Sequence, residues 1–114
     1  MERFVKGDIV VTPFPFSDLT SSIKRPALVI ANLKGEDIIL CQITTKQRQD
    51  QYIINLNKND FETGDLKVDS FIRISRIFTL RKSLILYKIG RLNKNKIKEI
   101  EDKICKLIKN NFIP

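Results

Sequence analysis

Residues 7–16 read Gly-Asp-Ile-Val-Val-Thr-Pro-Phe-Pro-Phe, a short β-branched run that ends at two alternating prolines. The run from Ile9 to Thr12 is typical of a strand, because β-branched side chains favour the extended backbone. Pro13 and Pro15 lack the backbone N–H that a strand ladder needs, so pairing ends there or continues only at a sheet edge. The chain is therefore expected to enter its fold through a strand that leads into a loop.

Apolar runs separated by turn signals continue through the first two-thirds of the chain. Polar residues 17–24 predict an exposed loop, and residues 32–37 predict a hairpin connection. Residues 57–69 are rich in turn-forming residues. Further strands are expected over residues 25–31, 38–45, 52–56, 70–80 and 84–92, with a bend near Ser75 and Arg76 and a bulge at Gly90.

The last fifth of the chain predicts one amphipathic helix. Asn93 is a favourable N-cap residue. Apolar residues after it recur at helical spacing and form one stripe, whereas lysines occupy the other faces. The stripe consists of Ile97, Ile100, Ile104, Leu107 and Ile108. About six short strands and a helix docked on them predict a small, partly closed antiparallel barrel.

Length and composition fit one soluble domain over residues 1–114. Hydrophobic residues make up 42% and charged residues 30% of the chain, an ordinary globular balance. No apolar run approaches the roughly 18 residues that cross a bilayer, and the N-terminus has no apolar core of signal-peptide length. We therefore expect a cytoplasmic protein without membrane contact.

The chain contains no histidine, which removes the commonest general base and metal ligand at neutral pH. Serine–histidine hydrolysis, zinc hydrolysis and two-histidine ribonuclease chemistry are thereby excluded. The two cysteines, Cys41 and Cys105, lack the Cys-x-x-Cys spacing, and disulfides are rare in the cytosol. We expect both thiols to be reduced, and we expect no metal and no cofactor.

Lysine and arginine number 21 against 13 acidic residues, a net charge of +8. Such an excess favours a polyanionic partner, because these side chains neutralise phosphates and release counterions. A lysine-rich composition by itself produces the same balance on a solvated surface, and an acidic protein partner suits a basic face equally well. Charge and strand pattern together indicate a basic, mostly-β cytosolic domain and leave its partner open.

Four short segments, in order from about residue 6 to about residue 109, resemble the MazF/PemK family of toxins. They are the strand and Pro-Phe element at 7–16, Arg25-Pro-Ala-Leu-Val-Ile at 25–30, Cys-Gln-Ile-Thr-Thr at 41–45, and the stretch 78–92. One departure is the loop before Arg25, which lacks the glycine that many relatives carry. The resemblance implies a small SH3-like (CcdB/PemK-type) antiparallel barrel with a C-terminal α-helix.

The same resemblance implies a function and partners. The chain would be the toxin of a type II toxin–antitoxin system, a homodimer that cleaves single-stranded RNA without a metal and inhibits translation and growth. Its antitoxin would carry an acidic disordered segment that folds on binding, and the toxin–antitoxin complex would bind DNA.

The resemblance also implies the catalytic residues. Arg25 matches the family's catalytic arginine, and a guanidinium offers a planar fork to two phosphate oxygens. Thr44 matches the second catalytic position, and its hydroxyl can donate to a phosphoryl oxygen or to the leaving 5′-oxygen. Strand alternation places Gln42 and Thr44 on one face and Thr45 on the other.

Several further residues are candidates for contacting RNA. Aromatic side chains stack on bases, hydroxyls hydrogen-bond to phosphates or bases, and basic side chains line a groove for the backbone. The candidates are Phe14, Phe16, Ser21, Ser22, Lys24, Thr45, Lys46, Arg48, Arg73 and Arg76.

Metal-free cleavage would use the neighbouring 2′-hydroxyl as nucleophile and leave a 2′,3′-cyclic phosphate and a 5′-hydroxyl. The protein would supply positioning and charge stabilisation more than a strong base. Two alternatives stay open on the sequence, a CcdB-like gyrase-directed toxin and a non-catalytic RNA- or protein-binding barrel. Gyrase-directed toxins of this fold act through a tryptophan-containing C-terminal tail, and this chain contains no tryptophan.

Overall fold

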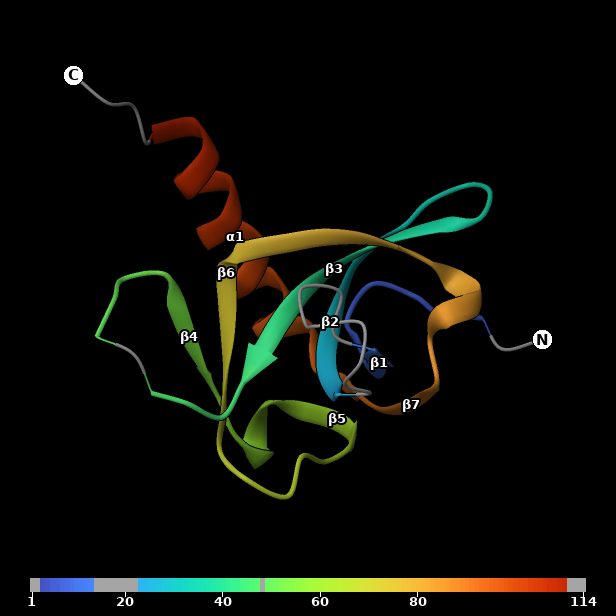
Figure 1. Cartoon of the computed structure of the whole chain (residues 1–114). Coiled ribbons are helices and arrows are strands. Elements are labelled where there is room, and N and C mark those ends of the chain that lie inside the picture. The colour runs from blue at the N-terminus through green and yellow to red at the C-terminus, as the bar shows by residue number, and fades with distance from the viewer. Residues whose placement is uncertain (1–2, 14–22, 48, 111–114) are drawn as a thin grey trace.

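The computed structural model of the chain describes residues 3–13, 23–47 and 49–110. In this part of the chain seven antiparallel strands form one sheet, in the order β4-β6-β3-β2-β1-β7-β5, which curls into a half-barrel (Figure 1). The strands are β1 (Asp8–Pro13), β2 (Lys24–Asn32), β3 (Asp37–Thr44), β4 (Ile53–Leu56), β5 (Phe61–Gly64), β6 (Ser70–Arg81) and β7 (Tyr87–Leu92). Two 3-10 turns, η1 (Lys58–Asp60) and η2 (Lys82–Leu84), and the helix α1 (Lys94–Asn110) complete the described elements. The mainly β barrel with a C-terminal helix is thus confirmed.

The sheet differs from the sequence prediction by one additional strand. The turn-rich stretch 57–69 contains β5, which pairs along the outer edge of β7. Its Gly64 has φ +73, and a Cβ there would lie 2.1 Å from the Ile89 carbonyl oxygen, so the two strands approach closely because this residue has no side chain. The strand that ends at Leu92 begins at Tyr87 and not at Leu84, because the Ile85 N–H closes the η2 turn onto the Lys82 carbonyl at 3.1 Å.

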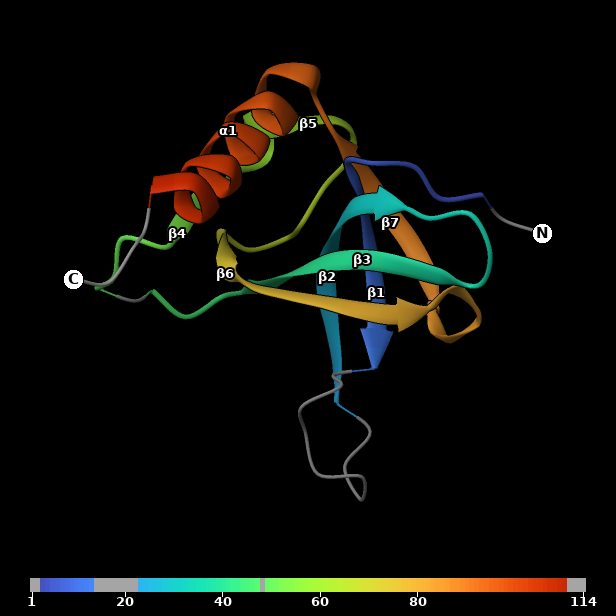
Figure 2. The ribbon, with the colours of Figure 1, turned by 90° about the horizontal axis from the view of Figure 1, so that it is seen from above.

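Helix α1 covers one side of the sheet, away from the end of β1 and the beginning of β2 (Figure 2). Asn93 caps it as predicted, since its side-chain oxygen accepts from the Lys96 N–H at 2.8 Å. Ile100 and Ile104 are buried, and Ile97 and Leu107 pack against the core. The prediction for Ile108 is wrong: this side chain is 71% exposed, because it lies about 100° around the helix from Leu107.

The two faces of the sheet carry separate apolar clusters, as strand alternation requires. The first cluster lies beneath α1 and includes Ile9, Leu28 and Cys41. The second cluster lies on the opposite face and includes Val10 and Ala27. Even-numbered residues of β1 and β3 and odd-numbered residues of β2 therefore belong to the face that α1 leaves uncovered.

A buried carboxylate fixes the start of β1. Asp8 has no exposed surface, and its two oxygens accept hydrogen bonds at 2.9 Å from the Val5 backbone N–H and the Arg91 Nε. The Lys88 ammonium lies 3.3 Å from the same carboxylate. The hydrogen bond to Asp8 also raises the pKa of Arg91 above its ordinary value. This arrangement, the Asp8 clamp, joins the N-terminal segment, β1 and β7.

Candidate active site

Three neighbouring strands bring Thr12, Arg25 and Thr44 into one row. In the β1–β2 register, Thr12 lies directly opposite Arg25. The last pair of the β2–β3 register is Ala27 with Gln42, and Arg25 and Thr44 each lie two residues beyond that pair. Because side chains two residues apart on a strand point to the same face, Arg25 and Thr44 project from the face of Ala27 and Gln42. The two residues that the sequence selected as catalytic therefore share one face and one end of the sheet.

The row continues the second cluster toward the end of β1 and the beginning of β2. Alternation places Thr12 two residues after Val10 on this face, and Arg25 two residues before Ala27. Thr12 is 1% exposed and Thr44 is 8% exposed. Arg25 is half-buried, and its Nε is shielded from solvent. The apolar half of the face thus changes into a polar half within one strand pair.

The hydroxyl of Thr44 is oriented by the backbone that follows it. Its Oγ1 accepts a hydrogen bond from the Lys46 N–H at 3.1 Å. Because a hydroxyl has one hydrogen and two lone pairs, an oxygen that already accepts keeps its hydrogen for donation. The Thr44 hydroxyl can therefore still donate its hydrogen to an acceptor.

A register shift between β3 and β6 adds Arg73 to the site. Ile43 pairs with Ile72, but Cys41 pairs with Ile77, so β6 bulges between these pairs. Figure 1 shows β6 turning sharply along its length. Arg73 follows Ile72 directly, is 9% exposed, and has its Nε shielded from solvent. By register it lies beside Gln42, one step along the face from Thr44.

The sequence prediction missed how buried Arg73 is. It placed the bend near Ser75 and Arg76, which is correct, and it grouped Arg73 with surface residues that could line a groove. Arg76 does lie exposed, whereas Arg73 turns inward. The available signal was position: Arg73 alternates with Ile72 and Ile74, and both of these belong to the first cluster. Arg73 is therefore on the face of the row.

Cys41 stays out of the chemistry of this site. Its Sγ donates a hydrogen bond to the Arg73 carbonyl oxygen at 2.9 Å. Burial raises the pKa of the Cys41 thiol to about 12, although the positive charge of Arg73 acts in the opposite direction. The thiol is protonated at neutral pH and is not a nucleophile. Both cysteines are free thiols; Cys41 is buried and Cys105 is exposed on α1.

The other predicted RNA-contacting residues divide into two groups. Lys24 adjoins Arg25 at the beginning of β2, and Thr45 and Lys46 directly follow Thr44, all three with exposed side chains. These lie at the same end of the sheet as the row. The remaining candidates lie outside the described residues: Phe14, Phe16, Ser21, Ser22 and Arg48.

With Gln42 and Arg73, which lie on the same face, the row contains five polar side chains, and their chemical types limit what it can do. Thr12, Arg25, Gln42, Thr44 and Arg73 supply two guanidinium groups, two hydroxyls and an amide, and none is a carboxylate, a thiol or an imidazole. Such a set binds an anionic oxygen, stabilises added negative charge and donates hydrogen bonds. It offers no side chain whose ordinary pKa suits a general base at neutral pH.

Within the described residues, α1 is too short and too polar to cross a membrane, and no other helix could do so.

Fold and site together define a small basic half-barrel with a row of guanidinium and hydroxyl groups on the face that its helix does not cover. The model of the PemK-like, MazF-like toxins of type II toxin–antitoxin systems matches residues 5–108. The chain belongs to this family of toxins. The comparison with curated protein sequences finds no match to this chain.

Solved structures share the fold at low sequence identity. An endoribonuclease in complex with its cognate antitoxin from a mycobacterial species superposes with a TM-score of 0.74 at 13% identity, over 97% of this chain and all of that one. The Mycobacterium tuberculosis toxin MazF-mt6 gives 0.71 at 15% identity, over 92% and 99% of the two chains. A MazE–MazF complex from Deinococcus radiodurans gives 0.71 at 17% identity, over 91% and 94%.

Proposed function

We propose that this toxin is a sequence-specific endoribonuclease that cleaves single-stranded RNA without a metal ion, by attack of the 2′-hydroxyl on the adjacent phosphodiester. The observation that supports the proposal is the row, in which Arg25 and Thr44 project from one face of the sheet, the face that also carries the buried Arg73. Endoribonuclease activity of structurally similar toxins supports it.

Each residue has one role in the proposed reaction. The Arg25 guanidinium binds the non-bridging oxygens of the phosphate and stabilises the negative charge that increases in the transition state. Thr44 donates its hydroxyl hydrogen to a phosphoryl oxygen or to the leaving 5′-oxygen. Arg73 adds positive charge behind them. Neither guanidinium serves as a base, because an arginine keeps its proton at neutral pH.

Positioning supplies the remaining rate enhancement. The 2′-hydroxyl is part of the substrate, so a row that fixes the phosphate also fixes its nucleophile in line. The donor set of the described residues supports metal independence, since the row contains neither carboxylate nor imidazole, the side chains that divalent cations prefer. The toxin is proposed to act in the cytoplasm as a homodimer.

An antitoxin completes the proposal. The net charge of +8 suits a partner with an acidic segment, and similar toxins are known in complex with a cognate antitoxin. The toxin–antitoxin complex is proposed to bind DNA, and the free toxin to bind RNA.

The deciding experiment is sequencing of RNA ends after incubation of pure protein with cellular RNA and a chelator. We expect cuts at one short sequence motif, with cyclic phosphate and 5′-hydroxyl ends. The variant Arg25→Ala, checked for unchanged circular dichroism, should cut at the same motif about 10²–10³-fold more slowly, or not at all. Inhibition of DNA supercoiling in the absence of any RNA cut would instead support a gyrase-directed toxin, and RNA binding without product would support a non-catalytic barrel.

A further inference from the structure

A basic depression lies at the hairpin end of β2, opposite the end that carries Arg25. Two adjoining hollows of about 560 Å³ and about 510 Å³ share the wall residues Phe4, Gly35 and Lys82. We call them together the distal hollow. Their charged wall residues are Arg3, Lys34, Glu36, Arg81 and Lys82. Four cationic side chains thus face one carboxylate.

Hydrogen bonds within the protein hold the walls of the distal hollow in place. The Lys82 N–H donates to the Glu36 carbonyl oxygen at 2.8 Å. The Lys82 ammonium donates to the carbonyl oxygens of Leu33 at 2.7 Å and Gly35 at 2.8 Å. These bonds attach η2 to the β2–β3 hairpin. Because these hydrogen bonds order the walls without a ligand, the protein loses little conformational entropy when a ligand binds.

Carboxylates of the described residues neutralise little of the positive charge in the distal hollow. The one ion pair inside it joins the Arg81 Nη2 and the Glu36 carboxylate at 3.9 Å, and both side chains are more than half exposed, so water and salt weaken it. Arg3 and Lys34 form no ion pair with another residue in the described ranges. The Lys82 ammonium, with three N–H donors and two carbonyl partners, retains one donor.

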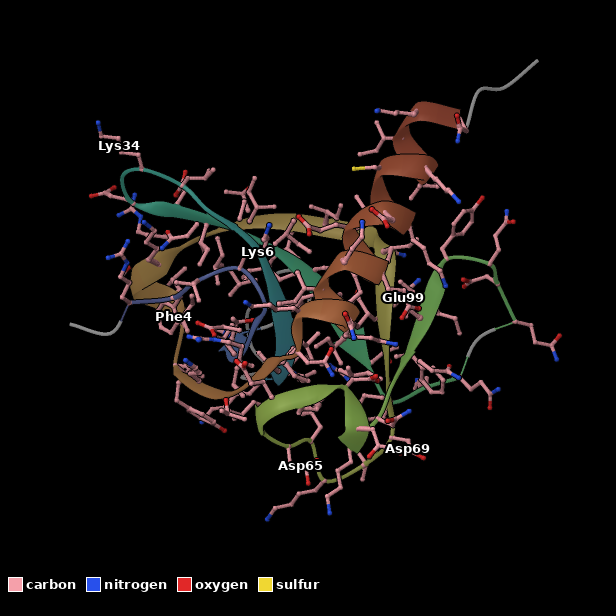
Figure 3. The ribbon with its side chains drawn as sticks, turned by 180° about the vertical axis from the view of Figure 1, so that it is seen from behind. Phe4, Lys6, Lys34, Asp65, Asp69 and Glu99 are labelled. Carbon is pink, nitrogen blue, oxygen red and sulfur yellow. The ribbon has the colours of Figure 1, made fainter. Side chains whose placement is uncertain are left out.

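The distal hollow lies on the same face of the sheet as the row. Phe4 and Ile85, which line it, pack in the second cluster with Val10 and Ala27. Figure 3 shows Phe4 and Lys34 at the end of the molecule away from the C-terminal end of α1. Along β2, the distance from Arg25 to Asn32 is roughly 20 Å. One extended RNA strand of several nucleotides spans that distance.

We propose that the distal hollow is a second phosphate site, which binds the backbone of the RNA strand several nucleotides from the bond that is cut. The inference rests on the proposed ribonuclease function and adds a substrate-length preference to it. Guanidinium and ammonium groups suit phosphodiester oxygens. RNA is favoured over an acidic peptide because a single RNA strand presents one anion at every nucleotide and reaches both sites at once.

The test compares two variants with equal changes in charge. Lys34→Glu/Arg81→Glu alters the distal hollow, and Lys94→Glu/Lys109→Glu alters exposed positions of α1. Each is assayed with a short RNA that covers only the cut motif and with a longer RNA that contains it. For the distal variant we expect KM for the longer RNA to rise about tenfold, while KM for the short RNA and both kcat values stay unchanged. The α1 variant should cut both RNAs like the parent protein.

Salt dependence gives a second measurement. Loss of two phosphate contacts should reduce the slope of log affinity against log salt by about 1 to 2 for the longer RNA. Equal KM changes in the two variants, or an equal effect on short and long RNA, would overturn the inference. So would loss of antitoxin binding with unchanged RNA binding, which would mark an acidic-protein site.

The inference and the proposed function fail in different ways. If the parent protein cuts neither RNA, the ribonuclease proposal fails. The distal hollow is then tested by filter binding of the same two RNAs: length-dependent affinity that the distal variant loses supports it, and affinity independent of length overturns it.

Discussion

The two ends of β1 use buried charge in opposite ways. At its start, the carboxylate of Asp8 is enclosed by Arg91, Lys88 and a backbone N–H. At its end, Thr12 belongs to a row that contains two guanidinium groups and no carboxylate. In the first arrangement the cations neutralise Asp8 and hold the N-terminal segment, β1 and β7 together. The second keeps cationic groups on a face where a phosphate can meet them, so the two ends should respond differently to mutation.

The largest effect is expected from Arg25→Ala. Removing the guanidinium that stabilises transition-state charge should lower the cleavage rate by about 10²–10³-fold, or more. The side chain is half-buried at a sheet end, so the free energy of unfolding should change by less than about 1 kcal/mol. Arg25→Lys, which keeps the charge and loses the fork, should recover only part of the rate. Cleavage at the parental rate by Arg25→Ala would contradict the view that the end of β1 carries catalytic charge and its start structural charge.

Asp8→Asn should produce the reverse pattern. The change keeps the shape but removes the charge that Arg91 and Lys88 face, and loss of one partner from a buried ion pair is costly. Because both cations retain some solvent contact, we expect a loss of about 2–4 kcal/mol in the free energy of unfolding. Denaturant titration measures this loss. At temperatures where the variant is folded, its cleavage rate should equal that of the parent.

Thr44→Val tests the hydroxyl without altering the strand, since valine keeps the β-branched shape. We expect cleavage to fall about 10- to 100-fold, the effect of one lost hydrogen bond in the transition state. Thr45→Val is the matched comparison, one residue further along and exposed; because Thr45 is a candidate RNA contact and not a candidate catalytic group, its loss should alter KM at most and leave kcat at nearly the parental value. An equal loss in both variants would show that the segment, and not the hydroxyl, matters.

The smallest effect on activity is expected from thiol modification. Iodoacetamide at pH 8 should label Cys105 and leave Cys41 unmodified, because burial raises the pKa of Cys41 to about 12. Mass spectrometry of the native and the unfolded protein distinguishes one label from two. The singly labelled protein should retain full ribonuclease activity. Raising the pH toward 12 should destabilise the fold, since only the unfolded thiol loses its proton below that value.

Sequence patterns predicted the elements whose signals are long or repeated. The β-branched run before Pro13, the hairpin after Asn32 and the capped helix after Asn93 all lie where they were expected. Strand β5 was not predicted because its four residues carry a single large apolar side chain. Its existence depends on close contact between Gly64 and β7, which no local pattern encodes.

The candidate site was predictable only in part for a related reason. Arg25 and Thr44 were selected by resemblance, and their roles stay predictions, although strand alternation beyond the Ala27–Gln42 pair places both on one face. The inward position of Arg73 depends on how β6 shifts against β3. A register shift is a property of two strands that are distant in the sequence, so the residue looked like one more surface cation.

The length of the outermost strands has a consequence for assembly. β4 and β5, which end the sheet on either side, contain four residues each, whereas the inner strands contain six to twelve. A short border strand exposes few backbone groups onto which another chain could add a strand. Two copies of the described sheet would therefore gain little by joining their edges, and we expect the proposed homodimer to form through contacts between side chains.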